Sequence, residues 1–350
     1  MANPNATFYA VSDSRYYPAV VGLLNSLQLT GHTEPVIIGD SGLTTAQREQ
    51  LARRCTVFPV PREVATVPAL LKAFPYLLRP RGVVVIIDSD MIVTGSLRES
   101  IEVAEAGKIC AFVDPEHDRR FPEWEPLFRL SRPLRHQPYV TTSYLAFSIA
   151  HWPGLLERWW SACESIPSDR TMWLRAPNSD PFAQGDQEPF NALLMSEIPE
   201  RAVHFLRDEE RPIAKGSAVR VLDSDALSCA YKGHPVKLLH ADGRHKPWAA
   251  SSFLHVRNQP YVRLLRRLLL DPNLSLTVPR HELPIWLRDG AAATAALWGL
   301  SCFNAATHPI TSNERSRLLL KRILRPAAAA PKAKAAASAS QSSAGVREHR

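Results

Sequence analysis

A short apolar run that ends in two carboxylates limits the fold more than any other part of the sequence. Val83–Ile87 is a run of five β-branched residues, and Asp88, Ser89 and Asp90 follow it directly. Such a run is typical of a strand buried on both faces, as in a parallel sheet. Because side chains two residues apart point the same way along an extended chain, Asp88 and Asp90 would lie together beyond the carboxyl end of the strand.

Two carboxylates at the end of a buried strand need a partner, because an unpaired buried charge is costly. A hard divalent cation such as Mg²⁺ or Mn²⁺ suits paired carboxylate oxygens. The alternative is an acidic turn in which Asp88 and Asp90 are solvated. The rest of the chain has to decide between these two interpretations.

Strands and helices alternate along most of the chain. Each predicted strand is short and apolar, and each predicted helix carries apolar residues at helical spacing. The predicted strands are residues 7–11, 35–39, 56–60, 83–87, 109–113, 139–147, 202–206 and 235–240, and the predicted helices are residues 17–27, 44–54, 68–78, 151–163 and 185–195. This order predicts an α/β fold with a mostly parallel sheet flanked by helices, and with ligand bound beyond the carboxyl ends of the strands.

The positive charge is concentrated near the C-terminus. The chain of 350 residues has a formal net charge of +8. Residues 314–350 contain nine Lys and Arg against two Asp and Glu, so +7 of that charge lies there and +1 in the rest. A nearly neutral body argues against a nucleic-acid-binding domain, so no nucleic-acid partner is expected. Residues 326–350 consist largely of Ala, Lys, Ser and Pro, which predicts a disordered basic tail.

Cysteine spacing and the N-terminus bear mainly on location. The five cysteines are scattered without a CxxC pair, which argues against a zinc ribbon and against a disulfide framework. The first five residues include neither a basic segment nor an apolar core, so no secretory signal is expected. The least polar stretch, residues 290–303, is shorter than the roughly 20 residues of a membrane span. A cytoplasmic location is therefore expected.

Two basic, leucine-rich segments near the C-terminus are predicted helices, at residues 261–270 and 314–325. Two arrangements are open for them. They could lie on an anionic membrane, which would make the protein peripheral at the inner face of that membrane. They could instead pack on the body of the protein with their arginines exposed.

A third informative stretch runs over residues 238–248. His240 ends an apolar strand, so it should lie at the same edge of the sheet as the two aspartates. Imidazole binds Mn²⁺-like metals beside carboxylates. Gly243 would let the backbone approach a phosphate group, and Lys246 would supply a positive charge for it. The alternative is a strand-end histidine followed by a basic turn.

Four separated pieces of the sequence match one protein family in the expected order. They are Asp88-Ser89-Asp90 as a DxD motif, His240 to Trp248 as HxxGxxKPW, Asp186-Gln187 with Asn191 as DQ-x3-N, and Phe8 to Tyr16 as a first nucleotide-binding strand and turn. On these motifs the chain resembles glycosyltransferase family 8. This group of retaining GT-A-fold transferases includes glycogenin and bacterial lipopolysaccharide galactosyl- and glucosyltransferases. The resemblance implies a GT-A-type domain at residues 6–255. The remaining residues predict a helical C-terminal extension at 256–325 and the tail at 326–350.

The resemblance also implies a role for each candidate residue. The metal ligands would be Asp88, Asp90 and His240, holding Mn²⁺ or Mg²⁺. The nucleotide sugar would contact Ser12, Asp13 and Tyr16 at the base, Asp88 near the ribose, Lys72 at the donor, and Gly243 and Lys246 at the diphosphate, and Ser89 would also belong to the cofactor-binding residues. Asp186 and Gln187 would be the catalytic residues beside the sugar.

Several positions depart from the family pattern. The Asn-Ser-Gly segment that faces the donor sugar in the family is Thr-Thr-Ser at residues 141–143 here, which leaves the identity of the sugar open. Phe182 and Ala183 stand where the family often has an acidic residue before the DQ pair. Asp13 could accept a hydrogen bond from a base edge or cap the helix that follows it.

The preferred hypothesis is a metal-dependent retaining hexosyltransferase. Such an enzyme would move a sugar from a nucleotide diphosphate donor, expected to be a UDP-sugar, to a glycan, lipid-linked sugar or protein acceptor. One alternative is a phosphatase of the haloacid dehalogenase type, which also uses a strand-end DxD with Mg²⁺, although Ile92 stands where that class has Thr or Val. The other is a nucleotide-sugar-binding protein of the same fold whose acceptor site has drifted.

Overall fold

The computed structural model describes residues 5–61, 63, 68–115, 118–167, 179–212, 218–241, 243 and 245–312. The chain divides into two compact units after Ser301. The first unit contains the sheets and the candidate site, and of the second unit residues 302–312 are described. The predicted helix at 314–325 and the predicted tail at 326–350 lie outside the described residues. The domain limits of 6–255, 256–325 and 326–350 remain a prediction.

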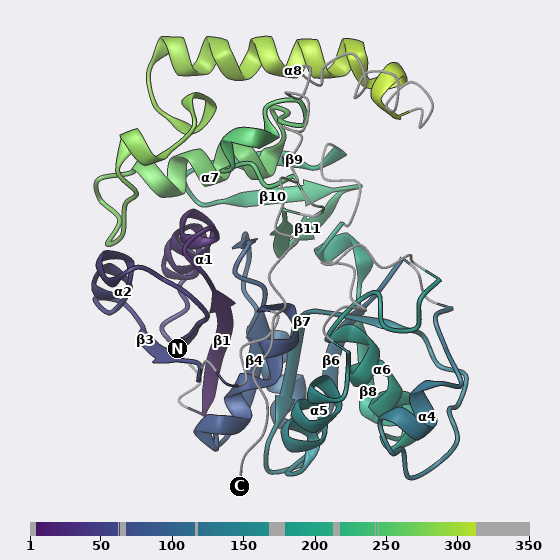
Figure 1. The fold of residues 1–350 in the computed structure, drawn as a ribbon. Coiled ribbons are helices and arrows are strands. Elements are labelled where there is room, and N and C mark those ends of the chain that lie inside the picture. Colours follow the sequence, from purple (N-terminus) through teal and green to yellow (C-terminus); the bar gives the residue numbers. More distant parts are fainter. Residues whose placement is uncertain are drawn as a thin grey trace, which may run out of the picture. The chain divides into compact units, whose positions relative to one another are not determined.

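A seven-stranded sheet forms the centre of the first unit (Figure 1). The strand order is β3-β2-β1-β4-β7-β6-β8, in which β7 is antiparallel to its neighbours and all other pairs are parallel. The strands are β1 (Ala6–Ser12), β2 (Val36–Asp40), β3 (Thr56–Pro59), β4 (Val83–Ile87), β6 (Ile109–Val113), β7 (Val140–Ser148) and β8 (Val203–Leu206). The predicted α/β class with a mostly parallel sheet is confirmed.

Helices cover both faces of this sheet because its central strand is apolar on both sides. Val83, Val85 and Ile87 of β4 pack in one hydrophobic cluster with α1, whereas Val84 and Ile86 pack in a second with α5 and α6. Burial of such a side chain contributes about 1.5–3 kcal/mol. The helices around the sheet are α1 (Tyr17–Leu29), α2 (Thr45–Leu51), the 3₁₀ helix η1 (Pro68–Leu78), α3 (Arg98–Glu105), α4 (Trp124–Leu127), α5 (Leu155–Glu164) and α6 (Gln187–Ser196).

The predicted strand at residues 235–240 is wrong as a single element. The chain forms β11 (His234–Val236) and β12 (Leu238–His240), which belong to different sheets. Strand β11 joins β9 (Arg220–Asp223) and β10 (Ser228–Tyr231), whereas β12 pairs with β5 (Met91–Val93). At the break, the Lys237 N–H donates to the Glu210 oxygen and the Lys237 oxygen accepts from the Thr94 N–H, each at 2.8 Å. Because Lys237 bonds to Glu210 and Thr94, it separates β11, which ends at Val236, from β12, which begins at Leu238.

Helix α7 (Pro260–Leu270) packs on α1 through a close approach of the two helices. A Cβ atom at Gly22 of α1 would stand 2.7 Å from Leu265 Cδ1, so a larger residue there would require the Leu265 side chain to shift. Asn25 Nδ2 of α1 donates to the Leu268 oxygen at 2.7 Å. The predicted basic helix is therefore packed on the core of the first unit through its leucines.

Helix α8 (Ala291–Ser312) begins within residues 290–303, the least polar stretch, for which no helix was predicted. Among the described residues, no helix is both long and apolar enough to cross a membrane. Short 3₁₀ turns complete the described structure at η3 (Glu200–Ala202), η4 (Asp208–Glu210), η6 (Ala250–Ser252), η7 (Arg280–Glu282) and η8 (Ile285–Leu287).

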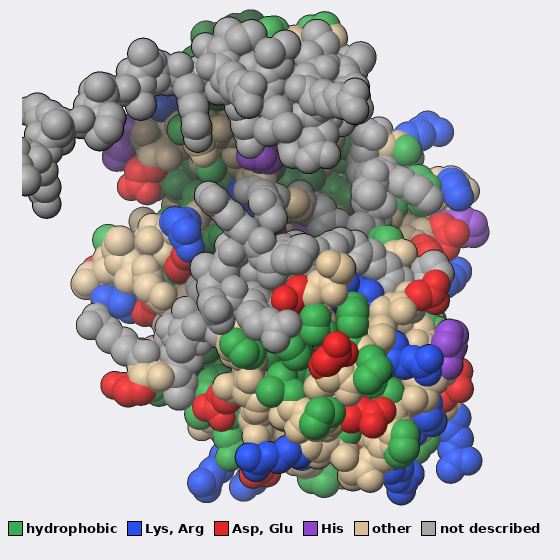
Figure 2. Space-filling view, turned by 45° about the vertical axis from the view of Figure 1, so that its right-hand side comes forward, with side chains coloured by type: hydrophobic (Ala, Val, Ile, Leu, Met, Phe, Trp, Pro, Cys, Tyr) green, Lys and Arg blue, Asp and Glu red, His purple; other side chains and the backbone are tan. Residues whose placement is uncertain are grey.

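Charged side chains of both signs are interspersed on the surface drawn in the lower part of Figure 2. Blue Lys and Arg side chains alternate there with red Asp and Glu side chains. This mixture agrees with the nearly neutral charge that the sequence gives for residues before 314.

Candidate functional site

A two-stranded ribbon brings distant residues to the carboxyl end of β4. Asp88 and Asp90 lie in the turn between β4 and β5, and the Asp88 N–H donates to the Ser143 oxygen of β7 at 2.9 Å. Strand β12 pairs with β5 in an antiparallel register that sets His240 opposite Met91. Because Met91 follows Asp90 directly, this pairing brings the imidazole to the two aspartates.

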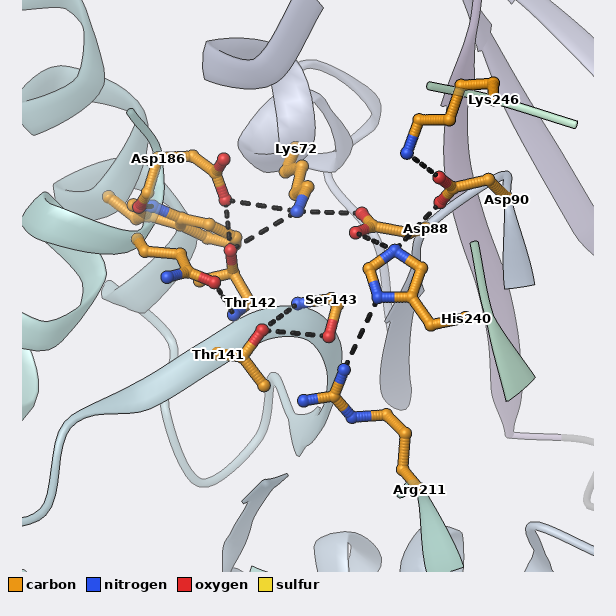
Figure 3. A network of polar contacts seen from close by, with 12 residues as sticks. Lys72, Asp88, Asp90, Thr141, Thr142, Ser143, Asp186, Arg211, His240 and Lys246 are labelled. Carbon is orange, nitrogen blue, oxygen red and sulfur yellow. Dashed lines mark hydrogen bonds and ion pairs between the residues drawn. The ribbon is translucent and has the colours of Figure 1, made fainter. Parts of the chain in front are cut away.

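Asp88, Asp90 and His240 form a cluster that fits a divalent metal ion (Figure 3). Their candidate ligand atoms all lie within 4.8 Å of one another. His240 Nε2 is 3.1 Å from Asp90 Oδ1 and 3.6 Å from Asp88 Oδ2. Two carboxylates and one imidazole form a donor set suited to Mn²⁺, and the carboxylates also suit Mg²⁺. The three residues predicted as metal ligands thus lie together.

Lys246 pairs with the second aspartate of the cluster. Its Nζ atom lies 2.6 Å from Asp90 Oδ2 and also donates to the Ala241 oxygen at 2.6 Å. Burial would raise the pKa of the Asp90 carboxyl, but His240 and Lys246 outweigh burial and hold that pKa well below its usual range. Asp90 is therefore an anion although it is only 4% exposed.

Lys72 links the first aspartate to a further carboxylate, Asp186. Lys72 Nζ is 2.7 Å from Asp88 Oδ1 and 3.5 Å from Asp186 Oδ2. It also donates to Thr142 Oγ1 at 3.3 Å, and this hydroxyl in turn donates to Asp186 Oδ2. Burial would lower the pKa of Lys72, but the carboxylates of Asp186 and Asp88 outweigh burial and raise that pKa. Lys72 therefore remains a cation. Figure 3 shows its contacts with both Asp88 and Asp186.

Asp186 and Gln187 stand at the start of α6 and face β7. Asp186 is 3% exposed, and burial raises the pKa of its carboxyl to about 6 against the opposing effects of Lys72 and Thr142. Above that pKa, at neutral pH, the carboxyl is ionised, which agrees with a charged Lys72 beside it. The Thr142 N–H donates to Gln187 Oε1 at 3.3 Å. The structure thus brings the two residues predicted as catalytic to the Thr-Thr-Ser segment of β7.

Residues predicted to surround a nucleotide base follow β1. The Asp13 carboxylate accepts from the backbone N–H groups of Arg15 and Tyr16, at 2.9 and 3.0 Å, just before α1 begins. Ser12 is 2% exposed, and its hydroxyl donates to the Asp13 oxygen at 3.2 Å. The Tyr16 ring centroid lies 5.7 Å from Lys246 Nζ. Tyr16 therefore reaches the cluster, whereas the side chains of Ser12 and Asp13 bond within their own turn.

Ser89 and Gly243 complete the predicted set. Ser89 lies between the two ligand aspartates and is 6% exposed. Gly243 has a φ of +89°, in the left-handed region that favours glycine, and nothing lies within 4 Å of the position that its Cβ would take. Gly243 therefore satisfies a backbone requirement and leaves open space in the loop that leads to Lys246.

Arg211 is a charged residue of the site that no sequence motif indicated. Its side chain is buried, with Nη1 3.5 Å from His240 Nδ1 and the guanidinium carbon 5.1 Å from the Phe112 ring centroid. A guanidinium can only donate, so His240 Nδ1 faces it as an acceptor. The role of the Thr142 hydroxyl was also missed, because the sequence shows that position only as a departure from a family pattern.

The site combines anionic and cationic groups in similar number. The buried or half-buried charged side chains are Asp88, Asp90, Asp186, Lys72, Lys246 and Arg211. Paired lysines can exchange a carboxylate for a phosphate oxygen, and carboxylates can exchange a lysine for a metal ion. Such a site can hold a divalent cation together with a phosphate-bearing molecule.

Comparison with solved structures identifies the fold as that of the GT-A glycosyltransferases. No protein-family model matches the sequence, and no curated protein matches it. The apo structure of WbbM, described as a bifunctional glycosyltransferase, matches with a TM-score of 0.52 and 14% identity. The match covers 78% of this chain and 50% of that chain, so this chain spans about half the length of WbbM.

Two further solved structures match at lower similarity. The galactosyltransferase LgtC, in complex with donor and acceptor sugar analogues, has a TM-score of 0.46 and 14% identity, over 76% of this chain and 98% of that chain. The apo glycosyltransferase GlyE of Streptococcus pneumoniae TIGR4 has a TM-score of 0.44 and 13% identity, over 71% and 56%.

Proposed function

We propose that this chain is a metal-dependent retaining glycosyltransferase of family 8, which transfers a hexose from a UDP-sugar to an acceptor hydroxyl. The observation that carries the proposal is the cluster of Asp88, Asp90 and His240, whose ligand atoms lie within 4.8 Å, with Lys246 and Lys72 paired to its two aspartates. The cluster lies where α/β sheets bind ligands, beyond the carboxyl ends of the strands. The fold shared with a bifunctional glycosyltransferase supports the same class of reaction.

The metal-side residues would stabilise the leaving diphosphate. When the anomeric C–O bond breaks, its electron pair goes to the diphosphate oxygen, and negative charge develops there. Mn²⁺ or Mg²⁺ held by Asp88, Asp90 and His240 would supply electrostatic stabilisation of this charge. Lys246 would exchange its 2.6 Å contact with Asp90 for a diphosphate oxygen. The backbone at Gly243 would let the same loop approach that oxygen.

The sugar-side residues would position the donor sugar and stabilise its positive charge. Asp186 and the amide oxygen of Gln187 are the acceptors that would face the developing oxocarbenium ion. An amide is a poor nucleophile, which favours a same-face route without a covalent enzyme intermediate. On that route the acceptor hydroxyl forms the new C–O bond on the face that the diphosphate leaves, and its proton passes to the departing phosphate oxygen. Lys72 would hold Asp186 and the donor in place.

The nucleotide would lie between β1 and the β4–β5 turn. Tyr16, 5.7 Å from Lys246 Nζ, would flank the base, with Ser12 and Asp13 beside it. Asp88 and Ser89 would contact the ribose, since they lie in the turn that follows β4. The acceptor in this proposal is a glycan, a lipid-linked sugar or a protein.

A panel of nucleotide sugars tests the proposal. Each donor is incubated with the full chain in Mn²⁺, in Mg²⁺ or in a chelator, and the products are identified by mass spectrometry. We expect one UDP-sugar to be hydrolysed or transferred in Mn²⁺ or Mg²⁺ but not in the chelator. The Asp90→Ala variant should lose this turnover and keep its circular dichroism spectrum, while Asp225→Ala, at a position that is 91% exposed in its side chain, should keep both. Full activity in Asp90→Ala would refute the assignment of the cluster.

The same panel separates the two alternatives. Cleavage of p-nitrophenyl phosphate with every nucleotide sugar left intact would identify a phosphatase. Metal-dependent binding of a UDP-sugar without hydrolysis or transfer to any acceptor would identify a binding protein. The fold shared with WbbM does not favour the phosphatase.

A further inference from the structure

Residues of α7 and of the first part of α8 line a cavity of about 530 Å³. Its wall includes Arg263, Arg266 and Arg267 of α7 and Leu297 and Trp298 of α8. None of the residues predicted for the metal or nucleotide-sugar site lines it. This α7–α8 cavity is therefore a second candidate binding site in the first unit.

One face of α7 carries buried leucines, and the opposite face carries the arginines that line the cavity. The leucines at positions 264, 265, 268 and 269 are buried in the hydrophobic core. Arg263, Arg266, Arg267 and Leu270 fall at i, i+3, i+4 and i+7, so they share the opposite stripe of the helix. The packing of α7 on α1 thus fixes which side chains line the cavity.

Two of the three arginines have no acidic partner among the described residues. Arg267 is occupied, since it pairs with Asp225 at 3.0 Å and donates to the Ser224 oxygen. Arg266 Nη1 donates to the neutral Thr294 hydroxyl at 3.0 Å, which leaves most of its N–H groups for other acceptors. Within the described part of the chain, Arg263 makes no ion pair, and its side chain is exposed.

The acidic residues of the cavity do not neutralise these two arginines. Asp289 pairs with Arg280, outside the cavity. Asp271 accepts from the backbone N–H of Asn273 at 2.9 Å and lies 3.9 Å from Arg267. Two guanidinium groups therefore remain as unpaired positive charge at one wall.

The α8 side of the cavity presents Leu297 and Trp298 beside the Thr294 hydroxyl. Trp298 is 58% exposed although it is a large hydrophobic residue, and Leu297 beside it is buried. Leu270 and Pro272 extend this apolar lining on the α7 side. An indole next to two guanidinium groups suits a molecule that carries a charged head and an apolar part.

We infer that the α7–α8 cavity binds a phosphate ester through Arg263 and Arg266. Guanidinium groups bind phosphate oxygens through two parallel N–H bonds, which makes arginine the side chain of choice for this ligand. Trp298 and Leu297 contact the apolar part that adjoins the phosphate. The ligand is the headgroup of an anionic phospholipid or a soluble phosphate ester, since both carry the same group. This inference does not rest on the proposed transferase function.

Binding of phosphate probes to the full chain tests the inference. Inorganic phosphate and glycerol 3-phosphate represent the soluble source, measured by equilibrium dialysis in a chelator. Phosphatidylcholine vesicles with and without phosphatidic acid represent the lipid source, measured by sedimentation. The test variant is Arg263→Gln/Arg266→Gln. Its matched control is Arg53→Gln/Arg201→Gln, which removes the same charge from two exposed positions elsewhere in the first unit.

We expect the test variant to bind at least one of these probes about tenfold more weakly than the wild type, and the control to bind like the wild type. Weakening with the soluble probes identifies a soluble phosphate ester as the ligand. Weakening with phosphatidic acid vesicles alone, together with weaker binding in Trp298→Ala, identifies a phospholipid headgroup. Equal binding by test and control variants on every probe would overturn the inference. Phosphate binding that Lys246→Met abolishes and the arginine variant keeps would overturn it as well, because the anion would then lie at the metal site.

Discussion

Asp90 and Asp186 are both almost fully buried, yet their carboxyl groups respond to burial in opposite ways. Asp90 is 4% exposed and Asp186 is 3% exposed. The pKa of Asp90 lies well below its usual range, because His240 and Lys246 outweigh burial. The pKa of Asp186 is raised to about 6, because burial outweighs Lys72 and Thr142.

The difference comes from the number of basic partners rather than from depth. Asp90 has Lys246 at 2.6 Å and His240 at 3.1 Å. Among the described residues, the basic partner of Asp186 is Lys72 at 3.5 Å, and Lys72 lies closer to Asp88, at 2.7 Å. Asp90, in the proposed metal site, is therefore held as an anion, whereas Asp186, beside the proposed position of the sugar, is an acid whose charge costs stability.

The largest effect is expected from breaking the metal side. Asp90→Asn leaves the half-buried Lys246 without its carboxylate, so we expect about 3 kcal/mol less unfolding free energy in denaturant titration. The double variant Asp90→Asn/Lys246→Met should recover most of that loss, because it removes both charges. Donor turnover should fall about a thousandfold in the single and the double variant. If the double variant is no more stable than Asp90→Asn, the pair does not account for the low pKa of Asp90.

A pH-dependent effect is expected on the sugar side. The folded pKa of Asp186, about 6, exceeds the ordinary aspartate pKa of 3.8, so the unfolded chain loses this proton first as the pH rises. The contribution of Asp186 to stability is therefore greatest below about pH 4 and declines until about pH 6, by at most about 3 kcal/mol. In chelator, Asp186→Asn should remove this decline, measured as unfolding free energy against pH. Asp225→Asn serves as the exposed control, and a decline that persists in Asp186→Asn would contradict the assignment.

The smallest effect is expected from a single hydroxyl. Thr142→Val keeps the shape of the side chain but removes the donor to Asp186 and the acceptor for Lys72. We expect about 1–3 kcal/mol less unfolding free energy at pH 7, where Asp186 is charged. Thr141→Val is the matched control, since its hydroxyl bonds only the neutral Ser143 hydroxyl and N–H in the described structure. Equal losses in the two variants would show that Thr142 has no special relation to Asp186.

The metal side could be predicted from the sequence because its signals are local. Five β-branched residues predict the buried strand β4, and the two aspartates one residue apart follow it directly. The position of His240 at the same edge followed from its place at the end of an apolar run. The pairing of β12 with β5, which places His240, could not be predicted, because these strands have three residues each and are too short for a periodic pattern.

The sugar side could be predicted only in part because its contacts are not local. Thr142 and Asp186 are 44 residues apart, and Lys72 and Thr142 are 70 apart. Nothing in the local sequence around Thr142 indicates that its hydroxyl will meet a buried acid. Arg211 lies in a charged stretch of ordinary composition, so its burial beside His240 follows from tertiary packing alone. Helix α8 was missed for a related reason, since its alanine-rich first turns carry no amphipathic pattern.

The ribbon of β5 and β12 joins segments that a ribosome makes at very different times. Asp90 and His240 are 150 positions apart, and the register of the ribbon sets His240 opposite Met91. A nascent chain that has not yet reached β12 has both aspartates but neither the imidazole nor Lys246. During synthesis, the central strands from β1 to β8 are therefore made before the proposed metal site is complete. The proposed metal site becomes complete only after translation has passed Lys246.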